Sequence, residues 1–232
     1  MMNLSGKGLF FALCFGFFTL FSCTARIDGS LETNGSARLT VSMSLGQRIT
    51  SLIRSFSSAG GQQTEQILDG ASIAKSMTGS PGVSSVTFRN TSASSVEGQI
   101  LISHIDEFFG KFITFEQKNT SGRCVININR DNASVILESL SSEVTDYLTA
   151  ILAPIAIGDE MTKPEYLELV TVFYNKAVSD EISASRIRAS IDFPANVKTV
   201  KGGVSSGRKA VFDVPLVDLL VLETPLNFEV TW

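Results

Sequence analysis

The order of the hydrophobic repeats along the chain limits its possible folds more than any other feature. Apolar and polar residues alternate over 37–45, which is the two-residue period of a strand with one buried and one wet face. Other stretches repeat their apolar residues at helical spacing. The predicted strands are 26–33, 37–45, 83–89, 96–105, 111–117, 123–130, 181–193, 208–214 and 226–232, and the predicted helices are 47–56, 64–77, 133–152 and 163–178.

These elements come in blocks and not in regular strand–helix alternation. Such blocks are typical of α+β proteins, in which helices cover one face of a mostly antiparallel sheet. No proline-rich linker, composition shift or internal repeat divides the chain after its N-terminal segment. The sequence therefore predicts a single α+β domain over 31–232, with a mostly antiparallel sheet and helices packed on one face.

Two local signals fix element boundaries. Asn34-Gly35 lies between two strand patterns, and this dipeptide favours a two-residue hairpin turn because both residues accept positive φ. Thr162 and Glu165 stand at capping-box spacing, with Pro164 inside the first turn of the helix that follows. We therefore expect a hairpin at the start of the domain and a helix that begins next to Thr162.

The N-terminal segment has the layout of a secretory signal. Residues 1–22 contain one cation, Lys7, and no acid, and 9–20 form an apolar run. This run of about a dozen residues is shorter than the roughly twenty that a transmembrane helix needs, so a permanent span is the weaker interpretation.

The end of this run, Leu20-Phe21-Ser22-Cys23, resembles the bacterial lipobox in the looser form of spirochaetes, since Phe21 is larger than the residue usual there. The resemblance implies a signal peptide over 1–22 and a lipidated Cys23 with a tether over 23–30. It also implies palmitate on Cys23, a cell-envelope location on the periplasmic or outer-membrane face, and the membrane as a partner through the anchor. The alternative is an ordinary signal cut near Ser22, with Cys23 an incidental thiol.

Charge and cysteine usage exclude several other functions. The 19 Lys and Arg residues against 23 Asp and Glu residues leave no basic excess for binding nucleic acid. Only Cys124 remains in the folded part if Cys14 lies in the signal and Cys23 carries lipid, so no internal disulfide is expected. Cys124 lies in a strand pattern and is interpreted as a small buried hydrophobe, with a reactive nucleophile as the alternative.

Two pairs of residues match catalytic motifs in part. Ser205 matches the letters of a nucleophile elbow without its strand-to-helix context, and its partner would be His104, the one histidine. Ser72 and Lys75 match a Ser-x-x-Lys dyad whose companion motifs are missing. The acid pairs at 106–107, 159–160 and 180–181 are interpreted as helix caps and solvated ends. No cofactor, metal site or catalytic residue is predicted, and the protein is expected not to be an enzyme.

Two apolar stretches, 147–157 and 214–222, remain. The first is interpreted as core and the second as an edge strand or ordered loop.

The first hairpin and the tail 194–232 resemble the LppM type of lipoprotein domain, which is associated with envelope lipids. The resemblance favours lipid among possible ligands. We therefore expect a non-enzymatic binding or assembly module with an apolar cleft between sheet and helices, for a lipid, another apolar ligand or an envelope protein. The alternatives are a serine hydrolase of the envelope and a structural or antigenic surface protein, which predicts no pocket of about 300 Å³ or more.

Overall fold

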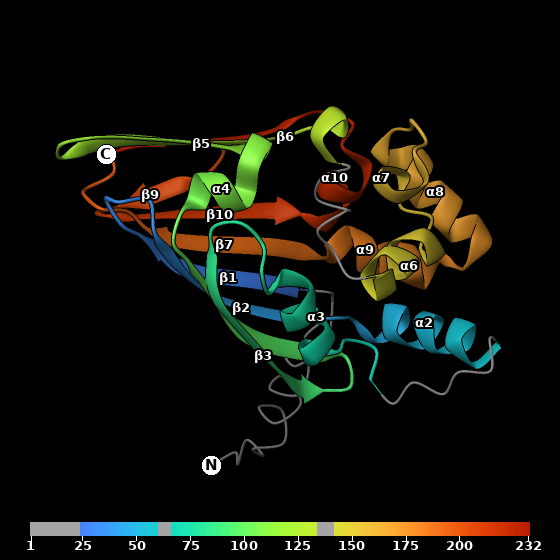
Figure 1. Ribbon diagram of the computed structural model, residues 1–232. Helices are drawn as coiled ribbons and strands as arrows, with labels where there is room; N and C mark the ends of the chain where they lie inside the picture. The colour runs from blue at the N-terminus through green and yellow to red at the C-terminus, as the bar shows by residue number, and fades with distance from the viewer. Residues whose placement is uncertain (1–23, 60–65, 134–141) are drawn as a thin grey trace, which may run out of the picture.

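Two sheets that face each other form the frame of the domain (Figure 1). The computed structural model describes residues 24–59, 66–133 and 142–232. The larger sheet has the order β3-β4-β2-β1-β7-β10-β9, and the smaller has the order β5-β6-β11-β8. Neighbouring strands are antiparallel except β1 and β7, which are parallel. The strands are β1 Thr24–Leu31, β2 Ala37–Ser44, β3 Val83–Ser92, β4 Ser95–Ile102, β5 Ile113–Lys118, β6 Ser121–Ile128, β7 Arg186–Asp192, β8 Thr199–Lys201, β9 Val204–Ser206, β10 Lys209–Pro215 and β11 Leu226–Thr231.

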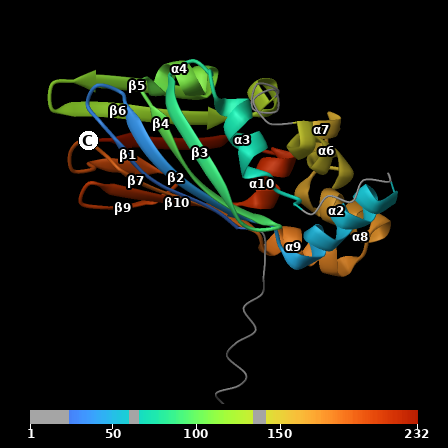
Figure 2. The ribbon, with the colours of Figure 1, turned by 60° about the horizontal axis from the view of Figure 1, so that its bottom comes forward.

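Most helices gather at one end of the two sheets (Figures 1 and 2). The helices are α2 Gln47–Ala59, α3 Gly70–Met77, α4 Ile105–Phe109, the 3₁₀ turn η1 Gly110–Phe112, α6 Ser142–Ala150, α7 Pro154–Ile157, α8 Lys163–Phe173, α9 Lys176–Ala184 and α10 Leu216–Val221. Helices α2 and α6 to α10 share an apolar core that includes Ile53, Tyr166 and Ile182. We call this cluster the helical core. Helix α3 packs against β3, and α4 precedes β5.

The faces of the strands follow the alternation in the sequence. In β7, Ile187, Ala189 and Ile191 point toward the smaller sheet, and the residues between them point to the opposite face. The outer face of the larger sheet carries exposed ion pairs, such as Arg26–Asp28 at 2.5 Å and Lys209–Asp192 at 3.7 Å. Exposed pairs of this kind contribute little to stability. The apolar faces that the two sheets turn toward each other therefore supply the main part of the second core.

The predicted fold class is confirmed, since the chain is a single α+β domain with a large, mostly antiparallel sheet. One detail differs, because strands predicted as one sheet form two. The smaller sheet covers most of the apolar face that the helices were expected to cover. Its strands alternate in the same way as those of the larger sheet, so their sequences do not tell the two sheets apart.

The hairpin at the start of the domain is confirmed, with β1 and β2 paired from Thr24–Ser44 to Leu31–Ala37 and Gly35 at φ +80°. The tether expected over 23–30 is wrong for its described part, because Thr24–Leu31 is strand β1. This strand is central and not peripheral, since it pairs with β2 on one side and with β7 on the other. The described part of the chain therefore begins with a central strand of the larger sheet.

Several helix boundaries differ from prediction. The capping box at Thr162 and Glu165 is confirmed, but the helix predicted over 163–178 breaks at Asn175, whose side chain caps α9. Helix α9 runs to Ala184, through residues predicted as strand. The stretch 214–222 contains helix α10 in place of an edge strand or loop.

The remaining boundary differences are smaller. Helix α3 begins at Gly70 with Asp69 as its cap, later than predicted. Strand β4 ends at Ile102, before the predicted end. Of the helical stretch predicted over 133–152, residues 134–141 lie outside the described residues, and α6 covers Ser142–Ala150. The apolar stretch 147–157 contributes Ile151 and Ala153 to the helical core, as predicted.

Candidate functional site

An apolar cavity of about 410 Å³ lies between the two sheets. Its walls come from β1, β2, β5, β6, β7, β10 and β11, and α4, η1 and α10 add side chains at the edges. Every wall residue is apolar, counting the thiol of Cys124 among them. The volume falls within the roughly 300–1,000 Å³ of typical ligand pockets. This volume argues against the alternative of a structural or antigenic surface protein, which predicts a packed core.

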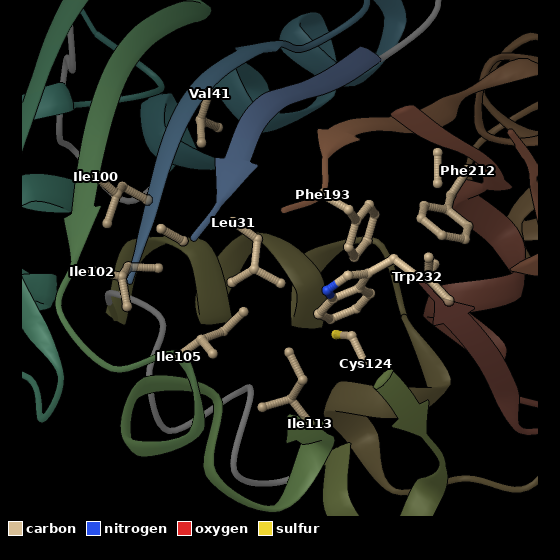
Figure 3. Packing of buried hydrophobic residues seen from close by; sticks show 13 residues of the cluster. Leu31, Val41, Ile100, Ile102, Ile105, Ile113, Cys124, Phe193, Phe212 and Trp232 are labelled. Atoms are coloured by element: carbon tan, nitrogen blue, oxygen red, sulfur yellow. The ribbon is translucent and has the colours of Figure 1, made fainter. Parts of the chain in front are cut away.

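An aromatic wall around Trp232 lies at one end of this cavity, where the Trp232 ring packs against the lining residue Phe193 (Figure 3). The Trp232 ring lies 5.2 Å from the Phe193 ring and is stacked on Phe115 at 6.1 Å, centroid to centroid. Its indole Nε1 donates a hydrogen bond to Oε1 of Gln117 at 3.2 Å. Gly122 leaves room for the ring, since a Cβ there would stand 2.3 Å from a Trp232 ring carbon. The wall is thus held by packing and by a hydrogen bond.

The wall residues differ in burial between the two ends of the cavity. At the Trp232 end, four of them are buried: Leu31, Cys124, Phe193 and Val230. Toward the helices, four others are half-buried: Ile128, Ile187, Val214 and Leu226. We call the first region the closed end and the second the accessible end.

Helix α10 separates the accessible end from the helical core. Leu219 faces the cavity, whereas Val217 and Leu220 belong to the helical core. The helix is fixed at its start by Leu216 N, which donates to Ser185 O at 2.9 Å, and on its side by an ion pair of 3.0 Å between Lys163 and Asp218. The accessible end therefore has a firm helical border.

Arg130 holds the C-terminal end of α10. Its guanidinium donates to the carbonyl oxygens of Leu222, Val221, Met161 and Asp159 at 3.1–3.2 Å. These four carbonyls belong to the end of α10 and to the segment between α7 and α8. One side chain thus joins the end of β6 to two segments of the helical part.

Arg130→Ala is expected to lower the free energy of unfolding by about 2–3 kcal/mol, because several carbonyl groups lose a charged donor. Urea denaturation followed by circular dichroism measures the change. Arg130→Lys serves as the control and is expected to lose less, since an ammonium keeps the charge but cannot reach all four carbonyls at once. Equal stability of Arg130→Ala and wild type would show that the four contacts are not what holds α10.

Cys124 is a wall residue of the cavity, in agreement with its interpretation as a buried hydrophobe. It is buried, and burial raises the pKa of its thiol to about 12. A thiol with such a pKa is almost entirely protonated at neutral pH, and the thiolate is the nucleophilic form. Burial and the raised pKa of the thiol therefore favour the buried hydrophobe over the alternative of a reactive nucleophile.

The other candidate catalytic residues lie apart from the cavity walls. His104, predicted on a strand, instead occupies the position before α4, and its side chain is 58% exposed with Nδ1 3.9 Å from Glu107. Ser205 is in β9, and β2, β1, β7 and β10 lie between that strand and β4, which leads to His104. Ser72 and Lys75 are on α3. The structure does not bring Ser205 and His104 together.

The acid pair at 106–107 lies at a helix end, as predicted, whereas the pair at 180–181 lies in the middle of α9. Asp106 and Glu107 are in the first turn of α4. Glu181 receives the backbone N–H groups of Arg48 and Ile49 at 2.9 Å and so caps α2, while Asp180 pairs with Lys176 at 2.5 Å. Across the described ranges, no group of three or more His, Cys, Asp or Glu side chains is placed to hold a metal ion.

A second depression, of about 530 Å³, is polar and open to solvent. It is lined by Arg130, Glu165 and Glu223 among others. These side chains already serve the fold, since Glu165 completes the capping box and Glu223 accepts from the backbone N–H of Lys163 at 3.1 Å. The enclosed apolar cavity is therefore the candidate site.

The strands of this cavity were predicted from the sequence, but Phe108 and Phe109 of α4 and Leu219 of α10 were not predicted to line it.

Cys23 and the signal segment lie outside the described residues. None of the helices in the described parts of the chain combines the length and the apolarity needed to cross a bilayer.

Comparison with known proteins gives one structural likeness. The sequence matches no family model and no curated protein. Among solved structures, the chain is similar to the NMR structure of the folded domain of the Mycobacterium tuberculosis LppM protein, with 9% sequence identity and a TM-score of 0.41. The match covers 93% of this chain and 91% of that one. At this identity and TM-score the likeness assigns no function.

Proposed function

We propose that this protein is a lipid-anchored protein of the cell envelope whose domain binds one hydrocarbon chain of a lipid and carries out no reaction on it. The observation that carries the proposal is the cavity between the sheets, whose walls are apolar throughout. Burial of apolar surface is favourable by about 0.8 kcal/mol for each methylene, so a hydrocarbon chain gains affinity along its whole length.

The length of the cavity suits one acyl chain. Its walls extend along β7 from Ile187 to Phe193, a separation of six residues. At about 3.3 Å a residue this distance is roughly 20 Å. One leaflet of the hydrocarbon core of a bilayer is about 15 Å thick, which is the reach of one acyl chain. A single chain therefore fits lengthwise between the sheets.

The chemistry of the walls excludes a polar group from the interior. They offer no charged side chain, and an unpaired polar group in such surroundings costs several kcal/mol, on the order of 2–7. The same surroundings provide no base, acid or activated nucleophile at the bound chain, since the one thiol in the walls is protonated. Binding without catalysis is the function that this chemistry favours.

The proposed anchor is Cys23, which immediately precedes β1. An acyl group on this residue would hold the domain at the membrane with no intervening tether. The proposed partners are then the membrane through the anchor and a lipid in the cavity, with an envelope protein as a further partner.

Native mass spectrometry of the Cys23→Ser protein, purified gently from the envelope of the expressing cells, tests the lipid-binding proposal. We expect a population that carries the mass of one lipid, which organic extraction removes and identifies. Only empty chains would contradict the proposal. Wild type is measured beside the variant. If Cys23→Ser binds added palmitate and wild type does not, the chain in the wild-type cavity is the acyl group of Cys23.

The anchor is tested by metabolic labelling with palmitate and detergent phase partitioning. Wild type is expected to carry the label and to enter the detergent phase, whereas Cys23→Ser is expected to be unlabelled and aqueous, because the acyl chains supply the membrane affinity. Cys124→Ala is the matched control and should behave as wild type. Label that persists in Cys23→Ser would place the modification elsewhere.

A further inference from the structure

We infer that the bound hydrocarbon chain enters from the accessible end beside α10, with its methyl end against the Trp232 wall and its polar head outside, next to the start of β1. This inference rests on the proposed function and adds the direction of the chain to it. It also fixes the side of the domain that meets the source of the lipid.

The closed end offers no passage for a lipid. Phe193 is 3% exposed, Val230 2% and Trp232 1%. The Trp232 backbone continues the ladder with β6 through two hydrogen bonds with Gly122, of 3.0 and 3.1 Å. Moving the indole ring would therefore break packing against two aromatic rings and its bond to Gln117.

The accessible end is bordered by α10 and lacks the aromatic stacking of the closed end. Its wall residues on four strands, β6, β7, β10 and β11, are half-buried, and the two sheets are joined there by α10, which follows β10 and precedes β11. A polar head left at this end keeps its contact with water, so the desolvation cost of a buried head does not arise.

The strand register brings the N-terminus to the same end. Thr24 pairs with Arg186 of β7 and with Ser44 of β2, and Ile187, the next residue of β7, lines the accessible end. Cys23 directly precedes Thr24. The mouth of the cavity and the proposed anchor thus share one end of the domain, where a chain can leave the bilayer without its head crossing the protein interior.

The single tryptophan of the chain makes the direction measurable. Bromine atoms quench indole fluorescence on close approach, so the Cys23→Ser protein is titrated with stearate brominated near its methyl end and with stearate brominated near its carboxylate. Native mass spectrometry confirms that each probe is bound. We expect the methyl-end probe to remove most of the Trp232 fluorescence and the carboxylate-end probe to remove little.

A reporter at the other end provides the matched control. In Leu219→Trp combined with Trp232→Phe, the indole lies beside α10, and the order of quenching should reverse. Equal or opposite quenching of Trp232 by the two bound probes would overturn the inferred direction and leave the proposed function standing. Failure of both probes to bind would overturn the proposed function itself.

Discussion

Ala189→Phe is expected to weaken the binding of palmitate by at least about 100-fold, because the new ring takes the place of about four methylenes at roughly 0.8 kcal/mol each. Ala189 lies in the middle of β7, between Ile27 and Phe212 on the neighbouring strands, and all three residues line the cavity. The free energy of unfolding should stay the same or rise, since the ring fills empty space. Displacement of a fluorescent fatty acid measures binding, and urea denaturation measures stability.

Ser190→Phe adds the same ring to the opposite face of the same strand and should bind palmitate as wild type does. Ser190 pairs with Asp28 and Val211 and is not among the wall residues. Wild-type affinity in Ala189→Phe would mean that palmitate binds outside the space between the sheets. Equal loss in both variants would point to a general disturbance of β7.

Trp232→Ala is expected to lower the free energy of unfolding by about 3–5 kcal/mol, the usual cost of truncating a buried large aromatic side chain. The substitution removes the contacts with Phe115 and Phe193 and leaves the Gln117 side chain without its indole donor. Urea denaturation followed by circular dichroism measures the loss, because the fluorescence signal disappears with the residue.

Phe56→Ala is the control for aromatic truncation at an accessible position. Phe56 is 44% exposed and makes one edge-to-face contact with Tyr174 at 6.1 Å. Its loss should cost less than about 1.5 kcal/mol. A comparable cost for the two variants would show that Trp232 does not hold the closed end together.

The strands were predictable because each buries one face, and alternation reports a buried face directly. The start of α8 was predictable for a different reason, since Thr162 and Glu165 satisfy the backbone of their own helix and need no distant partner. Helix α9 was missed because its sequence leads without a break into the alternating residues of β7. One of its contacts, the capping of α2 by Glu181, joins residues more than 130 positions apart.

The cavity itself could not be predicted from the strand patterns. Ile128 and Ile187 would alternate with polar neighbours in the same way whether the sheets packed tightly or left space between them. The space depends on how far apart the sheets stand, which is set by contacts between them, such as that of Trp232 with Phe193. The apolar cleft was predicted between the sheet and the helices, which is wrong, because the cavity lies between the two sheets. The sequence indicated that strand 226–232 buries Phe228, Val230 and Trp232 on one face, but not that a second sheet stands opposite that face.

Isoleucine methyl NMR during a titration of the Cys23→Ser protein with palmitate tests the central claim most directly. Isoleucines line the cavity at positions 27, 126, 128, 187 and 191, and the helical core contains Ile49, Ile53 and Ile182 as an internal reference. We expect the cavity methyl signals to shift and to show contacts with the palmitate chain, saturating at one equivalent, while the helical-core signals stay in place. Unchanged cavity signals, or shifts confined to the helical core, would contradict the claim that the two sheets hold a hydrocarbon chain between them.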